Sequence, residues 1–409
     1  MRPEDFDLAK VIHPIEPTTF FRDTWEKRPL HIARNDRQYY RPLFSMDDVD
    51  SIVAFTRPKF SNPGDFKPGG AAPRNFIQGC LADDDEEPAA VYPDVAEVHK
   101  AYARGKTLIL NAMQQRWLPV AVLCRRLEQF FGCPVHTNLY LTPPGAQGFS
   151  AHFDTHEVFV LQIEGAKHWR FYAPARELPL AEEWVPLARE DLGPPTQEAS
   201  MQPGDLLYMP RGHVHEAFTS ETLSLHLTVG VKVFRWIDLL RQALTHGSAR
   251  DVRLRESLPV GLLTDGTVPT PAARFRELLH ALAESAWADE AVEGMAGAFL
   301  GKLAGLPGPF FRTGADPEVG PDTVLERAPG MICRVFPLGR GRVALHFPGG
   351  RLEGPAKIAS ALHFIARTPR FAVRSLPDDL TAEAKQVLVR QLIGDRLLRI
   401  APGPCSDAS

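Results

Sequence analysis

Cysteine is scarce in this sequence, which has only five in 409 residues. The number is odd, and no two cysteines have the spacing of a zinc knuckle or a redox pair. The pattern therefore excludes a disulfide framework and a cysteine-rich zinc site. We expect reduced, mostly buried thiols at Cys80, Cys124, Cys133, Cys333 and Cys405.

Long apolar runs are also missing. No stretch approaches the roughly 18 apolar residues of a membrane-spanning helix. The first ten residues, MRPEDFDLAK, are acidic where a signal peptide would be basic. We therefore expect a cytoplasmic protein that does not enter a membrane. Internal repeats and low-complexity tracts are absent as well, and a chain with 44% hydrophobic and 23% charged residues predicts two or three globular domains.

The net charge of -4 is distributed unevenly. Residues 334–400 hold twelve Lys/Arg and five Asp/Glu, a balance of +7, so the rest of the chain carries -11. A basic C-terminal unit suggests contact with nucleic acid or the ribosome. An ordinary solvated surface explains each half equally well.

The middle of the chain has the periodicity of β-strands. Short alternating segments are separated by the Pro-Gly turns at 144–145 and 203–204, a pattern typical of a jelly-roll sandwich or barrel. The predicted strands cover 135–141, 157–163, 168–172, 205–209 and 222–233.

The flanking segments favour a mixture of helices and strands, so the overall prediction is an α+β fold. Before the barrel, a helix leads into an edge strand at 30–32, and surface loops are expected at 58–74 and 83–87. After it, apolar spacing predicts helices at 233–246, 270–286 and 289–304. The last stretch alternates helices at 355–367 and 381–393 with strands at 371–376 and 396–400.

Two histidines and an aspartate carry the clearest chemical signal. Residues two apart on a strand point to the same side, so His152 and Asp154 present an imidazole and a carboxylate to one face. The run 201–212 predicts a turn, a buried strand and a second turn that delivers His215 opposite them. Two histidines and one carboxylate form the facial triad of non-haem iron, with three positions left open.

Alternatives to this ligand set remain. His213 lies two residues before His215 and would share its side of a strand. The histidines could also be hydrogen-bonded members of a metal-free barrel. Zinc would be expected to take a fourth protein ligand or sulfur, and neither is offered. His156 and His168 are better explained as surface or substrate-groove residues.

Four motifs together resemble a known family. They are Phe21-x-x-x-Trp25-x-Lys27-x-Pro29-Leu30, Asn138-x-Tyr140-x-Thr142-Pro143, Glu157-x-Phe159-x-Leu161-Gln162-x-x-Gly165-x-Lys167-x-Trp169, and Pro-Gly-Asp followed by Pro-Arg-Gly-x-x-His. The set is similar to the ribosomal-oxygenase branch of the JmjC hydroxylases, and the similarity covers nearly the whole chain. The resemblance implies a double-stranded β-helix of the cupin type, with Fe(II) on His152, Asp154 and His215 and with 2-oxoglutarate and O2 as co-substrates.

The resemblance also implies a cation fifteen residues after the first ligand, which is Lys167. A dicarboxylate that binds iron through its keto-acid end leaves a second carboxylate to neutralise in an apolar barrel, so a lysine is physically appropriate. An ordinary strand-start lysine is the alternative. Further co-substrate or iron-proximal candidates project from strands that should line the same pocket: Asn138, Tyr140, Ser224 and His226.

The domain organisation follows from the same resemblance. It implies a JmjC catalytic domain with an N-terminal extension at 1–232, a helical dimerisation region at 233–310 and a winged-helix-like domain at 311–402, before a flexible tail at 403–409. The expected assembly is a homodimer. The helix at 381–393 has few of the side chains that read bases, so we favour a packing role or proximity to RNA for the last domain.

The predicted function is hydroxylation of a protein side chain, with a ribosomal protein as the expected substrate. Alternatives are the hydroxylation of a ribosomally made precursor peptide and a metal-dependent cupin acting on small molecules. A different class is a non-catalytic cupin and winged-helix regulator that binds DNA. Demethylation of lysine occurs among JmjC proteins, but the resemblance favours stable hydroxylation.

Overall fold

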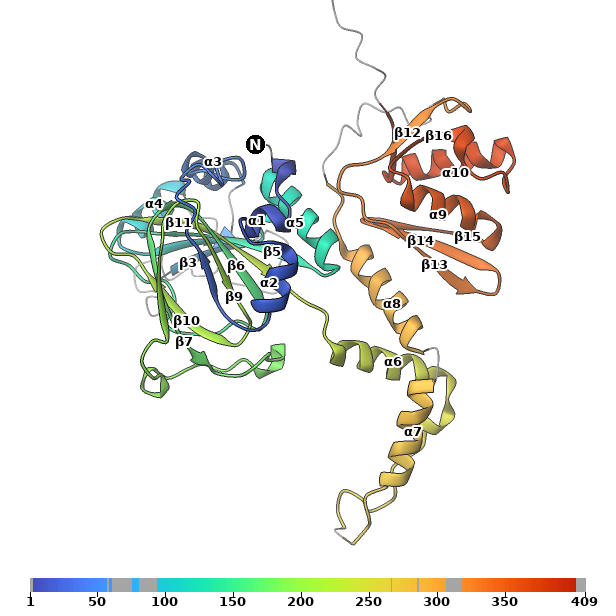
Figure 1. Cartoon of the computed structure of the whole chain (residues 1–409), viewed down its shortest axis with the longest axis horizontal. Helices are drawn as coiled ribbons and strands as arrows, with labels where there is room; N and C mark the ends of the chain where they lie inside the picture. Colours follow the sequence, from blue (N-terminus) through green and yellow to red (C-terminus); the bar gives the residue numbers. More distant parts are fainter. Residues whose placement is uncertain are drawn as a thin grey trace, which may run out of the picture. The chain divides into compact units, whose positions relative to one another are not determined.

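The computed structural model describes residues 3–56, 59–60, 76–80, 94–265, 267–284, 287–306 and 318–401. Contacts divide the chain into two units, Met1–Val233 and Phe234–Ser409 (Figure 1). The expected tail at 403–409 lies outside the described residues, as do the acidic run 83–87 and most of the predicted loop at 58–74.

Two sheets, antiparallel except for the parallel pair β3 and β4, form the core of the first unit and confirm the jelly roll. The large sheet has the order β1-β9-β6-β11-β5-β4-β3-β2, and the small sheet has the order β10-β7-β8. The large sheet consists of β1 (Leu30–Ile32), β2 (Lys59–Phe60), β3 (Phe76–Cys80), β4 (Thr107–Leu110), β5 (Val135–Thr142), β6 (Glu157–Gly165), β9 (Leu206–Met209) and β11 (Ser224–Val231), and the small one of β7 (Lys167–Pro174), β8 (Gln197–Met201) and β10 (His213–Phe218).

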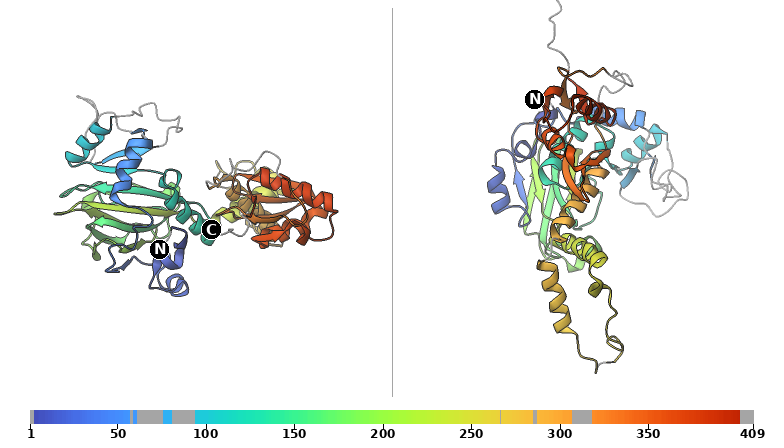
Figure 2. Two further views of the ribbon diagram at one scale, coloured as in Figure 1. Left: turned by 90° about the horizontal axis from the view of Figure 1, so that it is seen from above. Right: turned by 90° about the vertical axis from the view of Figure 1, so that its right-hand side faces the viewer.

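Helices cover one face of the large sheet. The elements α1 (Leu8–Ile12), α2 (Pro17–Asp23), α3 (Met46–Thr56), α4 (Val95–Ala103) and α5 (Leu118–Phe131) contribute to one apolar core (Figures 1 and 2). Alternate residues of the strands, such as Leu139, Leu161 and Leu227, point into that core. The opposite face meets the small sheet through Val158, Trp169 and others. Because β6 is buried on both sides along Glu157–Ile163, its sequence reads as an almost continuous apolar run.

Strand register arranges the cavity-facing side chains of the large sheet in rows. His136 pairs with Gly230, Asn138 with Thr228, Tyr140 with His226, and Thr142 with Ser224. Directly paired residues lie on the same side of an antiparallel sheet. The polar residues that alternate with leucine and valine in β5 and β11 therefore share one surface.

The predicted edge strand at 30–32 is confirmed as β1, which ends the large sheet of described strands and pairs with β9, with Leu30 opposite Tyr208. The strand β8 was not predicted. Only Met201 of its five residues is buried, so apolar alternation does not mark it.

The second unit begins with the three predicted helices and ends in an α/β part. The helices are α6 (Trp236–Arg250), α7 (Ala272–Glu284) and α8 (Trp287–Lys302). The α/β part contains the sheets β16-β12-β17 and β13-β14-β15. Its elements are β12 (Val324–Arg327), β13 (Arg334–Gly339), β14 (Arg342–Phe347), β15 (Gly350–Pro355), α9 (Ala359–Arg367), β16 (Arg370–Ala372), α10 (Ala382–Gly394) and β17 (Leu398–Ile400). The predicted strand at 371–376 was partly wrong, because a 3-10 turn replaces it from Val373.

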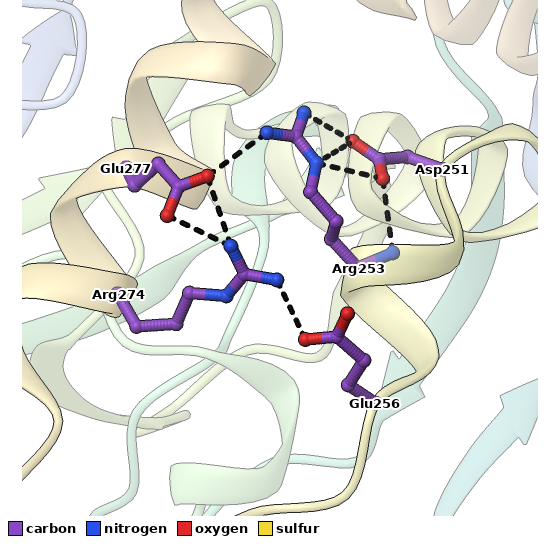
Figure 3. Close-up of polar contacts among 5 residues, drawn as sticks. All are labelled: Asp251, Arg253, Glu256, Arg274 and Glu277. Atoms are coloured by element: carbon purple, nitrogen blue, oxygen red, sulfur yellow. Dashed lines mark hydrogen bonds and ion pairs between the residues drawn. The ribbon is translucent and has the colours of Figure 1, made fainter.

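Helix α7 extends away from α8 and from the sheets of its unit (Figures 1 and 2). Ion pairs attach its first turns to the preceding segment, as Figure 3 shows. Arg253 donates to Asp251 and Glu277, while Arg274 donates to Glu277 and Glu256. These side chains are largely exposed, so the network orients the helix more than it stabilises the fold. None of the described helices is long and apolar enough to cross a membrane.

Candidate metal centre

The structure brings His152, Asp154 and His215 together. One potential ligand atom from each lies within 4.8 Å of the others, and they are the only group of this kind among the described residues. Asp154 Oδ2 is 3.6 Å from His215 Nε2. The three side chains come from the segment before β6 and from β10.

Backbone hydrogen bonds fix these two segments against each other. The N–H of His152 donates to the carbonyl of His215 at 3.0 Å, and the N–H of His215 donates back at 2.8 Å. The N–H of Gly212 donates to the carbonyl of Asp154, also at 2.8 Å. The triad is therefore joined at the main chain on both sides of the site.

The two imidazoles are oriented for metal binding. His152 Nδ1 lies 2.8 Å from the carbonyl of Ser150, and His215 Nδ1 lies 3.0 Å from the carbonyl of His213. Carbonyls only accept, so Nδ1 of each ring carries the proton and donates, which leaves Nε2 with a free lone pair. A backbone acceptor on the far nitrogen is the usual support of a metal-binding histidine.

The electrostatics favour the ligand forms of the triad. Burial, followed by repulsion from His152, lowers the pKa of His215 to about 4. Burial alone would raise the pKa of Asp154, but His156, His215 and the other nearby histidines lower it below its usual value. Neutral imidazole and ionised carboxylate are the states that bind a cation.

The triad opens into a cavity of about 120 Å³ between the two sheets. Its wall combines polar residues of the large sheet with aromatic and aliphatic groups of both sheets. The lining residues are Thr107, His136, Asn138, Tyr140, Thr142, Gly148, Phe149, His152, Asp154, His156, Val158, Lys167, Trp169, Met209, His215, Ala217, His226 and Thr228.

Lys167 reaches this cavity from β7 and is buried. Its Nζ donates to Thr142 Oγ1 at 2.8 Å, and no carboxylate of the described residues pairs with it. Burial lowers the pKa of Lys167 to about 7. A buried lysine without an acidic partner is an unfavourable arrangement that an anionic ligand would relieve.

The other predicted co-substrate residues separate into two groups. Asn138, Tyr140 and His226 line the cavity, where the Tyr140 and His226 rings stack at 5.0 Å. Burial, followed by the charge of Lys167, holds the pKa of His226 well below its usual value. Ser224 is buried in the same row as Thr142 but accepts from Gln162 Nε2, and it is not part of the cavity wall.

The remaining histidines are placed as follows. His213 does not reach the cavity wall, because the register of β10 shifts between it and His215 and breaks their alternation. His168 stacks on Phe218, and its Nε2 lies 3.1 Å from Ser220 Oγ. His156 lines the cavity together with His136, their ring centroids 5.0 Å apart. Burial, with the neighbouring His156, lowers the pKa of His136 to about 3.

Sequence reasoning missed several lining residues. Thr142 and His136 follow the same alternation as Asn138 and Tyr140, so extending the period of two along β5 would have identified them. Trp169 lies two residues after Lys167, and the indole Nε1 is buried without a hydrogen-bond partner in the described part of the chain. A tryptophan in an apolar strand carries no sequence signal that separates a cavity wall from a core.

Comparison with known proteins places the chain in a family. Residues 111–239 match the family model described as the JmjC domain. Ribosomal oxygenase 2 of Bos taurus is 33% identical over 303 residues, which are 69% of this chain and 62% of that protein. The bifunctional lysine-specific demethylase and histidyl-hydroxylase NO66 of Drosophila persimilis is 35% identical over 223 residues, 54% of this chain and 31% of that protein. The chain therefore spans less than two thirds of the length of these relatives.

Solved structures share the fold. The X-ray structure of E. coli ycfD superposes with a TM-score of 0.55 at 17% identity, covering 95% of this chain and 98% of that one. The structure of YcfD, a ribosomal oxygenase from Escherichia coli, in complex with cobalt and 2-oxoglutarate gives a TM-score of 0.52 at 17% identity, covering 95% and 99%. The solved structures show the shared fold, while the domain match over residues 111–239 and the sequence similarity to ribosomal oxygenase 2 show that this chain carries a JmjC domain and is a relative of the ribosomal oxygenases.

Proposed function

We propose that this protein is an Fe(II)- and 2-oxoglutarate-dependent oxygenase that hydroxylates a side chain of a protein substrate. The observation that carries the proposal is the position of Lys167, a buried lysine with no carboxylate partner among the described residues, in the same cavity as the triad. A cupin barrel without a dicarboxylate ligand has no use for this lysine.

The donor set suits iron. Three ligands of the His, Asp and His type, with no thiolate in the cavity wall, are typical of non-haem iron oxygenases. His152, Asp154 and His215 would hold the metal. When bound, iron together with 2-oxoglutarate and O2 supplies the oxidising chemistry that converts a C–H bond into C–OH.

The residues of the chain orient the reactants and keep the site dry. Lys167 and Thr142 would hold the distal carboxylate of 2-oxoglutarate, with the stacked rings of Tyr140 and His226 beside it. Apolar groups of the wall, such as Val158 and Met209, limit the entry of water.

The proposed substrate is a ribosomal protein, and the proposed place of action is the cytoplasm. Support comes from the relatives named ribosomal oxygenases. The test is mass spectrometry of ribosomal proteins from the host with and without the gene. We expect one ribosomal peptide to be about 16 Da heavier in the host than in the deletion strain. The wild-type gene should restore the heavier peptide, and the gene carrying Asp154→Ala should not. Unchanged ribosomal peptides would leave a precursor peptide as the alternative substrate.

The second unit is proposed to contribute assembly and contact with RNA. We divide it into a dimerisation region at 233–310 and a winged-helix-like domain at 311–402, which follow the catalytic domain at 1–232. Exposed apolar residues of α6, including Trp236, Leu240 and Leu244, support a homodimer. The paired positions Arg334 and Arg351, one on each side of His346 in the sheet β13-β14-β15, support proximity to RNA.

A non-catalytic DNA-binding regulator is the competing proposal. It would bind a defined duplex with strong dependence on salt and would have no use for 2-oxoglutarate. In α10, residues 382–387 offer Glu383, Lys385 and Gln386 as side chains of types that read bases, and Lys385 is buried and donates to Asp378. The intact triad and Lys167 favour the enzyme.

A further inference from the structure

One side of the cavity is closed by a short loop between β5 and the triad. Gly148 and Phe149 of this loop line the cavity, while the neighbouring Ser150 is exposed to solvent. Residues 147–150, which we call the wall loop, therefore form a thin wall between the cavity and solvent. Loops of this kind commonly open and close over a bound ligand.

The two ends of the wall loop are fixed to β10. On one side, the N–H of Thr219 donates to the carbonyl of Ala146 at 2.9 Å, and the N–H of Ala146 donates to the Thr219 hydroxyl at 3.0 Å. On the other side, the main chains of His152 and His215 exchange two hydrogen bonds. The wall loop therefore spans two fixed points, and its position over the cavity depends on the contacts of the residues between them.

The first part of the wall loop lies beside the Lys167 end of the cavity. A Cβ atom at position 148 would lie 3.1 Å from Oγ1 of Thr107, so the main chain of Gly148 packs closely on that residue. The Thr107 hydroxyl lies 3.3 Å from the hydroxyl of Thr142, which accepts from Lys167. The loop thus covers the place proposed for the distal carboxylate of 2-oxoglutarate.

Phe149 extends this cover to the metal end. Its ring centroid lies 5.5 Å from that of His152 and 6.2 Å from that of Tyr140. A dicarboxylate held between Lys167 and the triad would therefore lie behind the wall loop along its whole length. Such a ligand passes through this side of the cavity only when the loop moves.

Gln147 connects the wall loop to the small sheet. Its Nε2 donates to the carbonyl of Phe149 at 2.9 Å and to Oε2 of Glu216 at 3.2 Å. A carbonyl and a carboxylate only accept, so they take up the two hydrogens of the amide and determine its orientation. One side chain thereby joins the main chain that carries the Phe149 ring to β10.

Glu216 is a firm anchor for this amide. The side chain is buried, and its Oε1 accepts from the Tyr172 hydroxyl at 2.5 Å and from Arg189 Nη1 at 2.7 Å. Its other oxygen, Oε2, accepts from Gln147. A substitution of Gln147 would therefore release the wall loop and still leave the carboxylate with two partners.

We propose that the wall loop is a gate through which 2-oxoglutarate and the product formed from it pass, and that Gln147 is the positioning residue that keeps this gate closed. The inference rests on the proposed oxygenase function and concerns how its co-substrate enters and leaves. In the closed state, Gln147 joins Phe149 to Glu216 and the loop covers the cavity. When these two hydrogen bonds break, Gly148 and Phe149 move away from it.

The test follows the exchange of 2-oxoglutarate without turnover. The full chain is loaded with Co(II) in place of iron under argon, and stopped-flow absorption of the Co(II) ion reports the binding of 2-oxoglutarate. Mixing with increasing 2-oxoglutarate gives the association rate constant. Mixing the complex with an excess of the Zn(II)-loaded chain, which captures the released ligand and does not absorb visible light, gives the release rate constant. Calorimetry measures the dissociation constant independently.

Gln147→Met should raise the association and release rate constants together, each about five- to tenfold, the value of one or two hydrogen bonds. The dissociation constant should stay within roughly twofold of the wild-type value, because a gate changes entry and exit equally, whereas a residue that contacts the ligand changes mainly its release. The matched control is Gln197→Met, the same substitution at an exposed position of β8, which should keep the wild-type rates. If Gln147→Met does not fold by circular dichroism, Gln147→Glu replaces it, and the same joint rise in both rate constants is expected.

Two outcomes reject the gate alone. One is an unchanged pair of rate constants in the folded Gln147 variant. The other is a rise in the release rate constant only, with an equal loss of affinity, which would make Gln147 a ligand contact or a support of the binding site. If the wild-type chain binds neither Co(II) nor 2-oxoglutarate, the proposed function and the gate are rejected together.

Discussion

The main chains of His152 and His215 exchange two hydrogen bonds, of 3.0 and 2.8 Å, so that two of the three candidate metal ligands are aligned by the backbone alone. These two hydrogen bonds join the segments through the main chain and not through the side chains. Changes to the side chains should therefore affect metal binding without dismantling the site.

The two late histidines provide the sharpest test of the ligand set. His215→Ala should lower metal affinity at least as much as the roughly 10–100-fold loss typical of removing a supporting partner. His213→Ala should retain the metal, because only its backbone carbonyl serves the site, by accepting from His215 Nδ1. Metal content by mass spectrometry after dialysis measures both. If only the His213 variant lost the metal, the ligand would be His213 and the assignment of His215 would be wrong.

Replacing Lys167 should affect the co-substrate and not the metal. Lys167→Met removes the charged partner of a buried carboxylate, a loss of about 3–5 kcal/mol in similar pairs, so 2-oxoglutarate affinity should fall by two orders of magnitude or more. Calorimetry measures the affinity, and unchanged metal content serves as the control. Wild-type affinity in this variant would reject the assignment.

The binding of 2-oxoglutarate should also take up a proton. With a pKa of about 7, Lys167 is mostly neutral at about pH 8 in the free protein, while the carboxylate of the ligand favours the ammonium form. Calorimetry at this pH in buffers of different ionisation enthalpy should show an uptake approaching one proton. The Lys167→Met variant should show none. A binding enthalpy that is independent of buffer in the wild type would contradict the prediction.

The same lysine makes the stability of the free protein dependent on pH. The pKa of Lys167 is about 7 in the folded state and has its ordinary value of 10.5 in the unfolded state. Between these two pH values, Lys167 of the unfolded chain holds a proton that Lys167 of the folded chain does not. Because the unfolded state binds more protons, this contribution to stability rises with pH across that window. Urea unfolding should show a smaller rise for Lys167→Met than for the wild type.

A buried ion pair outside the cavity should matter for folding. Arg211 donates to Glu157 and Glu26, both at 2.6 Å, and the Glu157 side chain is fully buried. Arg211→Met removes the cationic partner of that buried carboxylate and should lower the free energy of unfolding by about 3–5 kcal/mol. Arg170→Met breaks an exposed pair with Glu198 and should cost less than about 1 kcal/mol. Similar losses in the two variants would be inconsistent with this view.

Assembly can be tested on α6. The exposed Leu240 and Leu244 lie four residues apart and share one face of the helix. Light scattering of the wild type should give about twice 45.4 kDa, and the double variant Leu240→Glu/Leu244→Glu should give the monomer mass. Phe55→Glu, at an exposed apolar position of α3, is the control and should remain dimeric.

The sequence predicted what depends on local pattern. Alternation along 135–141 and 157–163 identified the central strands. The spacing of His152 and Asp154, with His215 after the second turn, identified the three residues that the structure brings together, although His152 forms an isolated bridge and Asp154 lies outside any strand. The choice between His213 and His215 depended on a shift in the register of β10, which no local pattern encodes.

Relationships between distant segments were not predictable. The hydrogen bond from Lys167 to Thr142 joins β7 to β5, and the contact of His136 with His156 joins β5 to the residue before β6. They depend on which strands are neighbours and on the space above Gly230. Helix propensities and strand alternation describe one segment at a time, so neither contact follows from them.

The short pairing of β1 with β9 has a consequence for synthesis on the ribosome. Leu30 leaves the exit tunnel long before its partner Tyr208 has been made, so the first strand of the barrel waits while most of the unit is translated. Closing this edge is a contact of high sequence separation, the kind that slows folding. β9 is followed by a short turn and by β10, which carries His215, so the partner of the first strand and the last metal ligand are made within a few residues of each other.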